Sequence, residues 1–390
     1  MVLRAAIVVA AAALSVAAGG ASPEAAESRL LEQGPALVGG GAIWGEASPE
    51  GSPAPSLRLW SARRGERTVY ASDSLYLGSP LATSRTLVAF TRSYPSCPPK
   101  PNVICPQASD ALVGRPTGPF RMLAPPRTCT PFFAAAVDET FAAYEDRDCG
   151  HDLARLIVRD VVHRGRPVVL REAPDWRCCG QLALAGRYVA WSSGNRVNAN
   201  RAIVVNDRLA RRVAYRAPFR PPTGHSIEMD FDLQPDGTLA VAYRFVNGDT
   251  APGTGETKIA WFSPSEPRPH VLPLRGRTTL VRIAHDRIVL ERYLTSRRSS
   301  LVVSDLQGRV QRVARLVAPK RLRGFDFDGQ RIVWASDVVA STREDCPQHG
   351  RPPPCFKRET GVTSIWLRTD LTSPTSRIAT LPFNDVIARP

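Results

Sequence analysis

The chain has 390 residues, and its 51 Lys and Arg against 36 Asp and Glu give it a formal net charge of +15. A chain of this length exceeds what one hydrophobic core usually organises, so we expect either several domains or one repeat architecture. The basic residues are almost all Arg and are scattered rather than gathered in runs, and no nucleic-acid-binding motif is present. This distribution argues against nucleic acid as a partner, although a basic surface attracts acidic polymers.

The N-terminus has the features of a secretory signal peptide. Arg4 precedes an apolar run of about 14 residues, shorter than the roughly 20 that a membrane-spanning helix needs, and small residues follow it. We therefore predict a signal peptide over residues 1–21, cleaved after Ala18 or Ala21, and a secreted chain with no transmembrane segment left after cleavage. An uncleaved anchor is the alternative. Residues 22–35 are small, acidic and polar, which predicts a flexible lead-in.

From residue 36 onwards, short runs rich in Val, Ile, Leu and aromatic residues alternate with turn signals, which predicts strands rather than helices. The runs fall into groups of four, covering residues 36–71, 81–124, 132–171, 181–216, 227–272, 279–316 and 322–381. The third strand of several groups ends in Asp, as at Asp207 and Asp305. Such a carboxylate can accept hydrogen bonds from backbone N–H groups of the following turn.

Apolar second strands are the clearest repeated feature. Their central residues lie 44 to 54 positions apart and are Trp44, Phe90, Tyr144, Trp191, Tyr243, Leu290 and Trp334. Four short strands per unit of this length are typical of a β-propeller blade. The sequence therefore predicts an all-β fold over residues 36–390, a seven-bladed β-propeller of four-stranded antiparallel blades, with a β-sandwich pair as the alternative. Ring closure stays open, since Phe383–Arg389 could be a tail or could pair with the first blade.

One unit carries a more specific motif. Pro235-Asp236-Gly237 is followed by the apolar run Thr238–Tyr243, and this turn and strand resemble the repeats of secreted TolB-like and WD40-like β-propellers. The resemblance covers this unit well, while the other units keep the hydrophobic pattern without the Pro-Asp-Gly turn. It implies a propeller fold. It carries no specific role over to this chain, because such repeats serve many functions.

The loops of the two propeller faces differ in length. Chain direction alternates from strand to strand, so the loops after second strands share one face with the connections between blades. Several of these loops are long, for example over 92–110 and 336–362, whereas the turns on the opposite face are short. Scaffolded loops commonly carry function, so we expect the functional face to be the one with long loops.

All eight Cys are expected on the long-loop face, and in a secreted chain they predict disulfides. Spacing within single loops predicts Cys97–Cys105 and Cys346–Cys355. The other four, Cys129 and Cys149 with Cys178 and Cys179, are expected to pair in an order that the sequence does not assign. A vicinal Cys178–Cys179 bond is the alternative.

The chain has no Gly-x-Ser-x-Gly elbow, His-Glu-x-x-His motif, P-loop or dinucleotide fingerprint, so no catalytic residue is predicted. The richest polar cluster follows a second strand, and two further His are expected on the same face. These candidate ligand-binding residues are Asp146, Asp148, His151, Asp152, His225 and His349. Carboxylates beside an imidazole can bind a cation or act as general acid and base, whereas the plainer interpretation is a solvated loop. We predict no metal and no cofactor.

Two main functional hypotheses follow. The absence of catalytic motifs favours a secreted, non-catalytic propeller, expected to be a monomer, that binds a protein or glycan through its disulfide-bearing loop face. The alternative is a secreted hydrolase or lyase that acts on glycan or peptide, with a site assembled from several loops. A purely structural envelope component is a third interpretation.

Overall fold

The computed structural model describes residues 30–47, 55–71, 76–95, 107–127, 135–148, 153–174, 181–193, 201–247, 257–345 and 356–388. Within these ranges every regular element is a β-strand. No helix in the described ranges has the length and apolar character needed to cross a bilayer. The strands form six antiparallel sheets.

Four sheets follow one another along the first part of the chain. The first contains β1 (Leu30–Val38), β2 (Gly41–Ala47), β3 (Ser56–Ser61) and β4 (Gly65–Ala71). The second contains β5 (Tyr76–Thr83), β6 (Val88–Pro95), β7 (Gln107–Gly114) and β8 (Phe120–Arg127). The third contains β9 (Ala135–Asp138), β10 (Phe141–Asp148), β11 (Leu153–Asp160) and β12 (Val168–Pro174). The fourth contains β13 (Leu182–Ala185), β14 (Tyr188–Ser193), β15 (Arg201–Asp207) and β16 (Arg212–Phe219).

Two sheets complete the fold. The fifth contains β17 (His225–Leu233), β18 (Leu239–Asn247), β19 (Thr257–Phe262), β20 (His270–Ala284), β21 (Arg287–Thr295), β22 (Arg298–Asp305) and β23 (Val310–Val317). The sixth contains β24 (Lys320–Phe327), β25 (Ile332–Asp345), β26 (Phe356–Arg368) and β27 (Ser376–Ala388).

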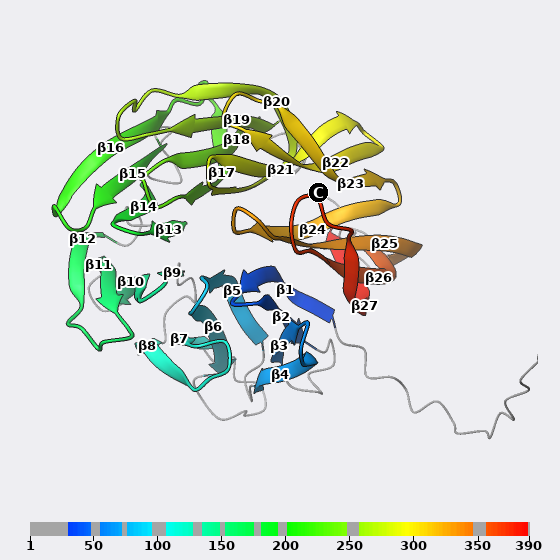
Figure 1. The fold of residues 1–390 in the computed structure, drawn as a ribbon, viewed down its shortest axis with the longest axis horizontal. Coiled ribbons are helices and arrows are strands. Elements are labelled where there is room, and N and C mark those ends of the chain that lie inside the picture. The colour runs from blue at the N-terminus through cyan, green and yellow to red at the C-terminus, as the bar shows by residue number, and fades with distance from the viewer. Residues whose placement is uncertain are drawn as a thin grey trace, which may run out of the picture.

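Figure 1 shows the sheets arranged around a common centre, with the first strand of each four-stranded sheet nearest the middle. The inner strands contact one another in a cyclic series, from β1 through β5, β9, β13, β17, β20 and β24 back to β1. This is the arrangement of a β-propeller. The prediction of an all-β fold built from four-stranded antiparallel sheets is confirmed, and the sandwich pair is not observed.

The seven-stranded sheet differs from prediction at β20. The sequence predicted a break between the groups 227–272 and 279–316, but one strand runs from His270 to Ala284. Its first half pairs with β19 and its second half with β21, and the register shifts between Gly276 and Val281. A Cβ on Gly276 would lie 3.1 Å from Thr257 Cβ. Glycine therefore lets the strand stay extended as it passes close to β19.

The hydrophobic core lies between neighbouring sheets. On β18, every side chain from Leu239 to Ala242 is buried, since one face of the strand packs towards the fourth sheet and the other towards β20–β22 of its own seven-stranded sheet. A single four-stranded sheet cannot bury both of its faces, so each depends on its neighbours for stability. The same packing joins the first and last sheets, where Leu37 and Trp44 lie in one cluster with Val333 and Ile365.

Ring closure occurs without exchange of strands between the first and last sheets. β27 pairs with β26 as far as Ala388, so Phe383–Arg389 is neither a tail nor a partner of the first sheet over its described residues. β1 pairs with β2. Apolar packing and a hydrogen bond from Leu37 N to Asp326 Oδ2, 2.7 Å long, join the two sheets instead.

Two boundaries also differ from prediction. β1 begins at Leu30, inside the predicted flexible lead-in 22–35, because Leu31 is buried in the cluster shared with the last sheet. The predicted loop 336–362 is largely a two-stranded arm in which β25 and β26 stay paired as far as Asp345 and Phe356.

Candidate functional site

Polar side chains on the inner strands connect neighbouring sheets around the centre. Asp138 Oδ2 accepts a hydrogen bond from Gly186 N at 2.6 Å, and Gln181 Nε2 donates one to the Phe231 carbonyl at 3.0 Å. Asp232 Oδ2 accepts one from Ile283 N at 2.9 Å. Each bond joins two successive inner strands, or the residue next to one of them, so these side chains stabilise the ring.

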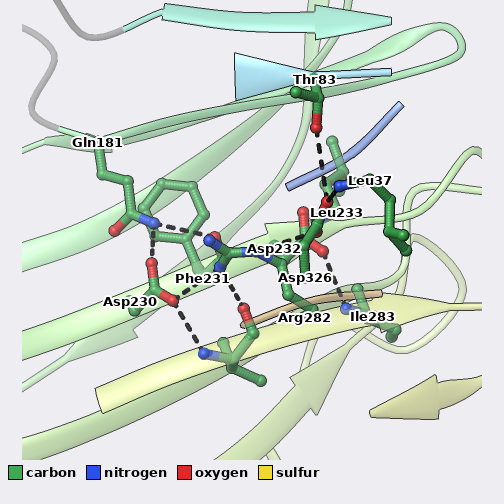
Figure 2. Close-up of polar contacts among 11 residues, drawn as sticks. Leu37, Thr83, Gln181, Asp230, Phe231, Asp232, Leu233, Arg282, Ile283 and Asp326 are labelled. Atoms are coloured by element: carbon green, nitrogen blue, oxygen red, sulfur yellow. Dashed lines mark hydrogen bonds and ion pairs between the residues drawn. The ribbon is translucent and has the colours of Figure 1, made fainter. Parts of the chain in front are cut away.

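One part of this inner lining is densely charged, and we call Asp230, Asp232, Arg282 and Asp326 the axial cluster (Figure 2). Arg282 Nη1 lies 3.0 Å from Asp230 Oδ2, and Arg282 Nε lies 3.6 Å from Asp326 Oδ1. Asp230 and Asp232 are two residues apart on β17, so their side chains lie on the same face of that strand. The axial cluster thus brings three carboxyl groups and one guanidinium together from β17, β20 and β24.

The axial cluster remains partly exposed. The side chains of Asp230, Asp326 and Arg282 are 13%, 19% and 31% exposed to solvent. Backbone and side-chain donors occupy most of the carboxylate oxygens, since Asp230 accepts from Gln181 and from Val281 N at 2.9 Å. Asp326 Oδ2 accepts a hydrogen bond from Leu37 N at 2.7 Å, and the Phe327 N–H also bonds to this carboxylate. Arg282 Nε lies 3.6 Å from Asp326 Oδ1.

The surroundings shift the acidity of two carboxyl groups. Burial raises the pKa of Asp232 to about 6; Arg282 and the N–H groups of Ile283 and Leu233 act against the rise, and the charge of Asp326 adds to it. Burial also raises the pKa of Asp326, against the opposing effects of Arg282 and Leu37 N–H. Asp232 therefore keeps a substantial protonated fraction near pH 6.

Arg282 stays charged under all physiological conditions. Burial acts to lower its pKa, but the carboxylates of Asp230, Asp232 and Asp326 outweigh that effect and raise it. A carboxyl group that holds a proton near neutral pH, beside a permanent cation, can supply proton transfer and can stabilise a developing negative charge. Among the described residues, no group of three or more His, Cys, Asp or Glu has metal-binding geometry.

Of the predicted ligand-binding residues, Asp146, Asp148 and His225 lie within the described part of the chain. Asp146 lies on β10 and is half-buried, while His225 begins β17 and places Nδ1 3.2 Å from the Thr223 carbonyl. Asp148 ends β10. Outside the described residues lie His151, Asp152, His349 and all eight Cys, so the disulfides stay predictions.

Sequence reasoning missed the axial cluster. Its signal is an ionisable residue between two apolar ones in a first strand, as in Phe231-Asp232-Leu233, Phe325-Asp326-Phe327 and Val281-Arg282-Ile283. In each triplet the flanking residues are buried in the sheet packing. Because side chains alternate along a strand, the middle residue points the other way, towards the channel. These triplets lie within strands and belong to no linear catalytic motif.

No protein-family model matches the chain, and no curated protein sequence is similar to it. Solved structures do match. A prolyl endopeptidase matches with a TM-score of 0.52 and 15% sequence identity. The match covers 88% of this chain and 54% of the endopeptidase chain. The β-propeller domain of the Trilobed protease from Pyrococcus furiosus has a TM-score of 0.45 at 11% identity, covering 78% and 95%. An oligogalacturonate lyase in complex with manganese has a TM-score of 0.49 at 12% identity, covering 76% and 82%.

These similarities concern the fold. The chain spans about half the length of the prolyl endopeptidase that it matches. The predicted resemblance to propeller proteins is confirmed at the level of fold, and no particular repeat family is shown.

The main functional prediction is corrected by these matches. The sequence favoured a non-catalytic propeller that binds through its disulfide-bearing face, whereas a structure similar to this chain belongs to a prolyl endopeptidase. Linear motifs do not reveal the axial cluster, because its contacts join residues 44 to 289 positions apart.

Proposed function

We propose that this protein is an enzyme, a hydrolase or a lyase acting on glycan or peptide, and that the axial cluster is its active site. The observation that carries the proposal is the placement of Asp326 and Asp232, both with raised pKa, around Arg282 in the accessible centre of the ring. Groups with perturbed acidity that converge on a concavity are candidates for catalysis. The matches to peptidases and a lyase support the same class.

The proposed roles follow from the contacts. Asp326 is the general base, and Asp232, whose pKa is raised to about 6, is the general acid. Arg282 stabilises negative charge that develops on substrate oxygen, and Asp230 holds its guanidinium in place at 3.0 Å. Asp230 is therefore a positioning residue.

The proton balance distinguishes the two reactions. In hydrolysis, Asp326 takes a proton from water, the water oxygen attacks the substrate carbon, and Asp232 protonates the leaving nitrogen or oxygen. In a lyase reaction, Asp326 takes a proton from carbon and Asp232 protonates the leaving oxygen, with no water consumed. Return of the proton from Asp326 to Asp232 through solvent resets either cycle.

We further propose that the ring has seven blades. The support is β20, whose two halves pair with different strands, and the cyclic series of inner-strand contacts that includes β20. On this proposal β20 supplies the outer strand of one blade and the inner strand of the next. Export, the disulfides and a monomeric state remain predictions from the sequence.

The test is turnover of a mixed panel of unlabelled peptides and neutral and acidic oligosaccharides, with products identified by mass spectrometry. Products that have gained the mass of water indicate a hydrolase, and products that have not indicate a lyase. Asp326→Asn should reduce turnover by about a hundredfold or more, the usual contribution of a general acid or base. Asn keeps an oxygen that can accept the hydrogen bond from Leu37 N, so folding should survive.

Asp138→Asn is the matched control. Its carboxylate makes the same kind of bond between inner strands, to Gly186 N, and has no contact with Arg282 among the described residues. This variant should retain wild-type turnover. Turnover that is unchanged in Asp326→Asn, or lost equally in both variants, would refute the assignment.

A further inference from the structure

A second concavity lies away from the axial cluster, between the second and third sheets. Its volume is about 750 Å³, within the range of ligand-binding pockets. The lining comes from β7, β8, the turn that joins them, the start of β6, and the end of β11 with the turn that follows. No residue of β17, β20 or β24 contributes to it. We call it the arginine groove.

Four guanidinium groups line the arginine groove, from Arg115, Arg121, Arg159 and Arg164, and the lining contains no Asp or Glu. Arg159 Nε donates to the Gly165 carbonyl at 3.3 Å. The other three make no ion pair with any residue that the structure describes, and all three are exposed. The groove therefore presents uncompensated positive charge to solvent.

The nearest carboxylate in the sequence does not neutralise this charge. Asp160 ends β11 and accepts hydrogen bonds from Val162 N at 3.1 Å and His163 N at 2.8 Å. Its second oxygen lies 2.9 Å from His163 Nδ1. Asp160 is thus engaged in its own turn, as expected for an Asp that closes a strand.

The remainder of the arginine groove is aliphatic. Met122 and Val162 are 49% and 40% exposed, and Val113 and Leu123 form a buried floor. No aromatic residue lines the groove, so it lacks the flat surfaces on which sugar rings usually stack. A ligand that fits this lining carries carboxylates for the guanidinium groups and apolar side chains for the aliphatic floor.

We propose that the arginine groove binds an acidic peptide segment whose carboxylates alternate with aliphatic side chains. Paired carboxylate–guanidinium contacts supply orientation, and burial of Met122 and Val162 supplies apolar area. The proposal is independent of the axial cluster. It also concerns the face with short turns, since the contributing turns join first to second or third to fourth strands.

The experiment measures fluorescence anisotropy of full-length protein with a fluorescein-labelled peptide in which Glu and Leu alternate, at near-physiological salt. The same peptide with Gln in place of Glu is the ligand control. Arg121→Glu/Arg164→Glu should weaken binding of the acidic peptide by about tenfold or more, because two charge-assisted contacts are lost and reversed. Arg212→Glu/Arg298→Glu makes the same change in net charge at exposed positions on β16 and β22, and should leave binding within about threefold of wild type.

Three outcomes would overturn the proposal. Equal binding of the Gln peptide would show that carboxylates are not recognised. Equal losses in both double variants would show attraction to the overall positive charge alone. Binding of an acidic oligosaccharide that depends on Arg121 and Arg164, without binding of the peptide, would assign the groove to another class of ligand.

Discussion

At the scale of single residues, Asp232 joins a structural role to a chemical one. Its two carboxylate oxygens accept the N–H groups of Leu233 and Ile283, each at 2.9 Å, and so connect β17 to β20. Burial nevertheless raises its pKa to about 6. The protonated carboxyl group of Asp232 therefore stabilises the folded ring. The ionised form is less favourable in the folded protein, because its charge is buried.

A first prediction concerns stability as a function of pH. The pKa of Asp232 is higher in the folded protein, about 6, than its ordinary value of 3.8, so its favourable contribution is full below 3.8 and is lost as pH rises through 6. At about 1.4 kcal/mol per pKa unit, the loss is about 3 kcal/mol. Asp232→Asn removes this titration. We expect the free energy of unfolding of the wild type, measured by urea denaturation, to fall by about 3 kcal/mol relative to that of Asp232→Asn between about pH 4 and about pH 8.

Asp138→Asn is the control for this measurement, because it alters an inner-strand carboxylate that bonds to Gly186 N. Parallel pH profiles of wild type and Asp232→Asn would contradict the account of Asp232.

Individual residues were predicted from the sequence only where the interaction is local. Asp207 Oδ1 accepts from Leu209 N and Ala210 N, and Asp305 Oδ1 accepts from Gln307 N and Arg309 N, as expected of an Asp that ends a third strand. The axial cluster was not predicted, because its members come from strands far apart in the chain. Their convergence depends on the ring.

At the scale of elements, the Pro-Asp-Gly turn between β17 and β18 shows why one repeat carries a stronger motif than the others. Gly237 has φ +90°, and a Cβ there would lie 2.8 Å from Pro264 Cγ and 2.9 Å from Tyr188 Cε2. Asp236 Oδ1 accepts from Thr238 N at 2.8 Å. The turn thus needs glycine both for its backbone conformation and for the close approach of neighbouring residues.

A second prediction follows for this turn. Gly237→Ala should destabilise the protein by about 2–5 kcal/mol, since positive φ costs about 1–2 kcal/mol and overpacking about 1–3 kcal/mol. Gly224→Ala is the matched control, because Gly224 has φ +79° with no atom within 4 Å of an added Cβ. In the same urea denaturation, Gly224→Ala should be destabilised only by the cost of positive φ, about 1–2 kcal/mol. Equal losses in the two variants would show that the close approach carries no cost.

The strands themselves were largely predicted by alternating apolar patterns, and the groups at 181–216 and 132–171 correspond to β13–β16 and β9–β12. The exceptions are β20 and the arm of β25 and β26. In both, pairing continues through residues that a local pattern assigns to a break or loop, because partners across the sheet keep the chain extended.

At the scale of the whole molecule, the ring is closed by side chains rather than by a shared strand. Trp44 is fully buried where the first and last sheets meet, and its Nε1 donates to Glu46 Oε1 at 2.8 Å. The bond from Leu37 N to Asp326 spans 289 residues. No sequence pattern indicates such a contact, which explains why ring closure was left open.

A third prediction tests this closure. Trp44→Ala should cost about 3–5 kcal/mol, the usual range for a large buried aromatic side chain. Hydrogen exchange should accelerate first in β1, β2 and β25–β27. Phe231→Ala is the comparison, because Phe231 is equally buried between the fourth and fifth sheets, and it should accelerate exchange in β13–β18 instead. Uniform acceleration throughout the ring in Trp44→Ala would contradict a local closure.

The most direct test of the axial cluster as an active site is the pH dependence of kcat/KM on a substrate identified from the panel. With Asp232 as general acid, activity must fall as pH rises through about 6, because the acid loses its proton. Asp138→Asn should keep the same profile. A decline centred near pH 6 in both proteins would support proton transfer by the axial cluster, and activity that is constant or rising between about pH 5 and about pH 8 would contradict it.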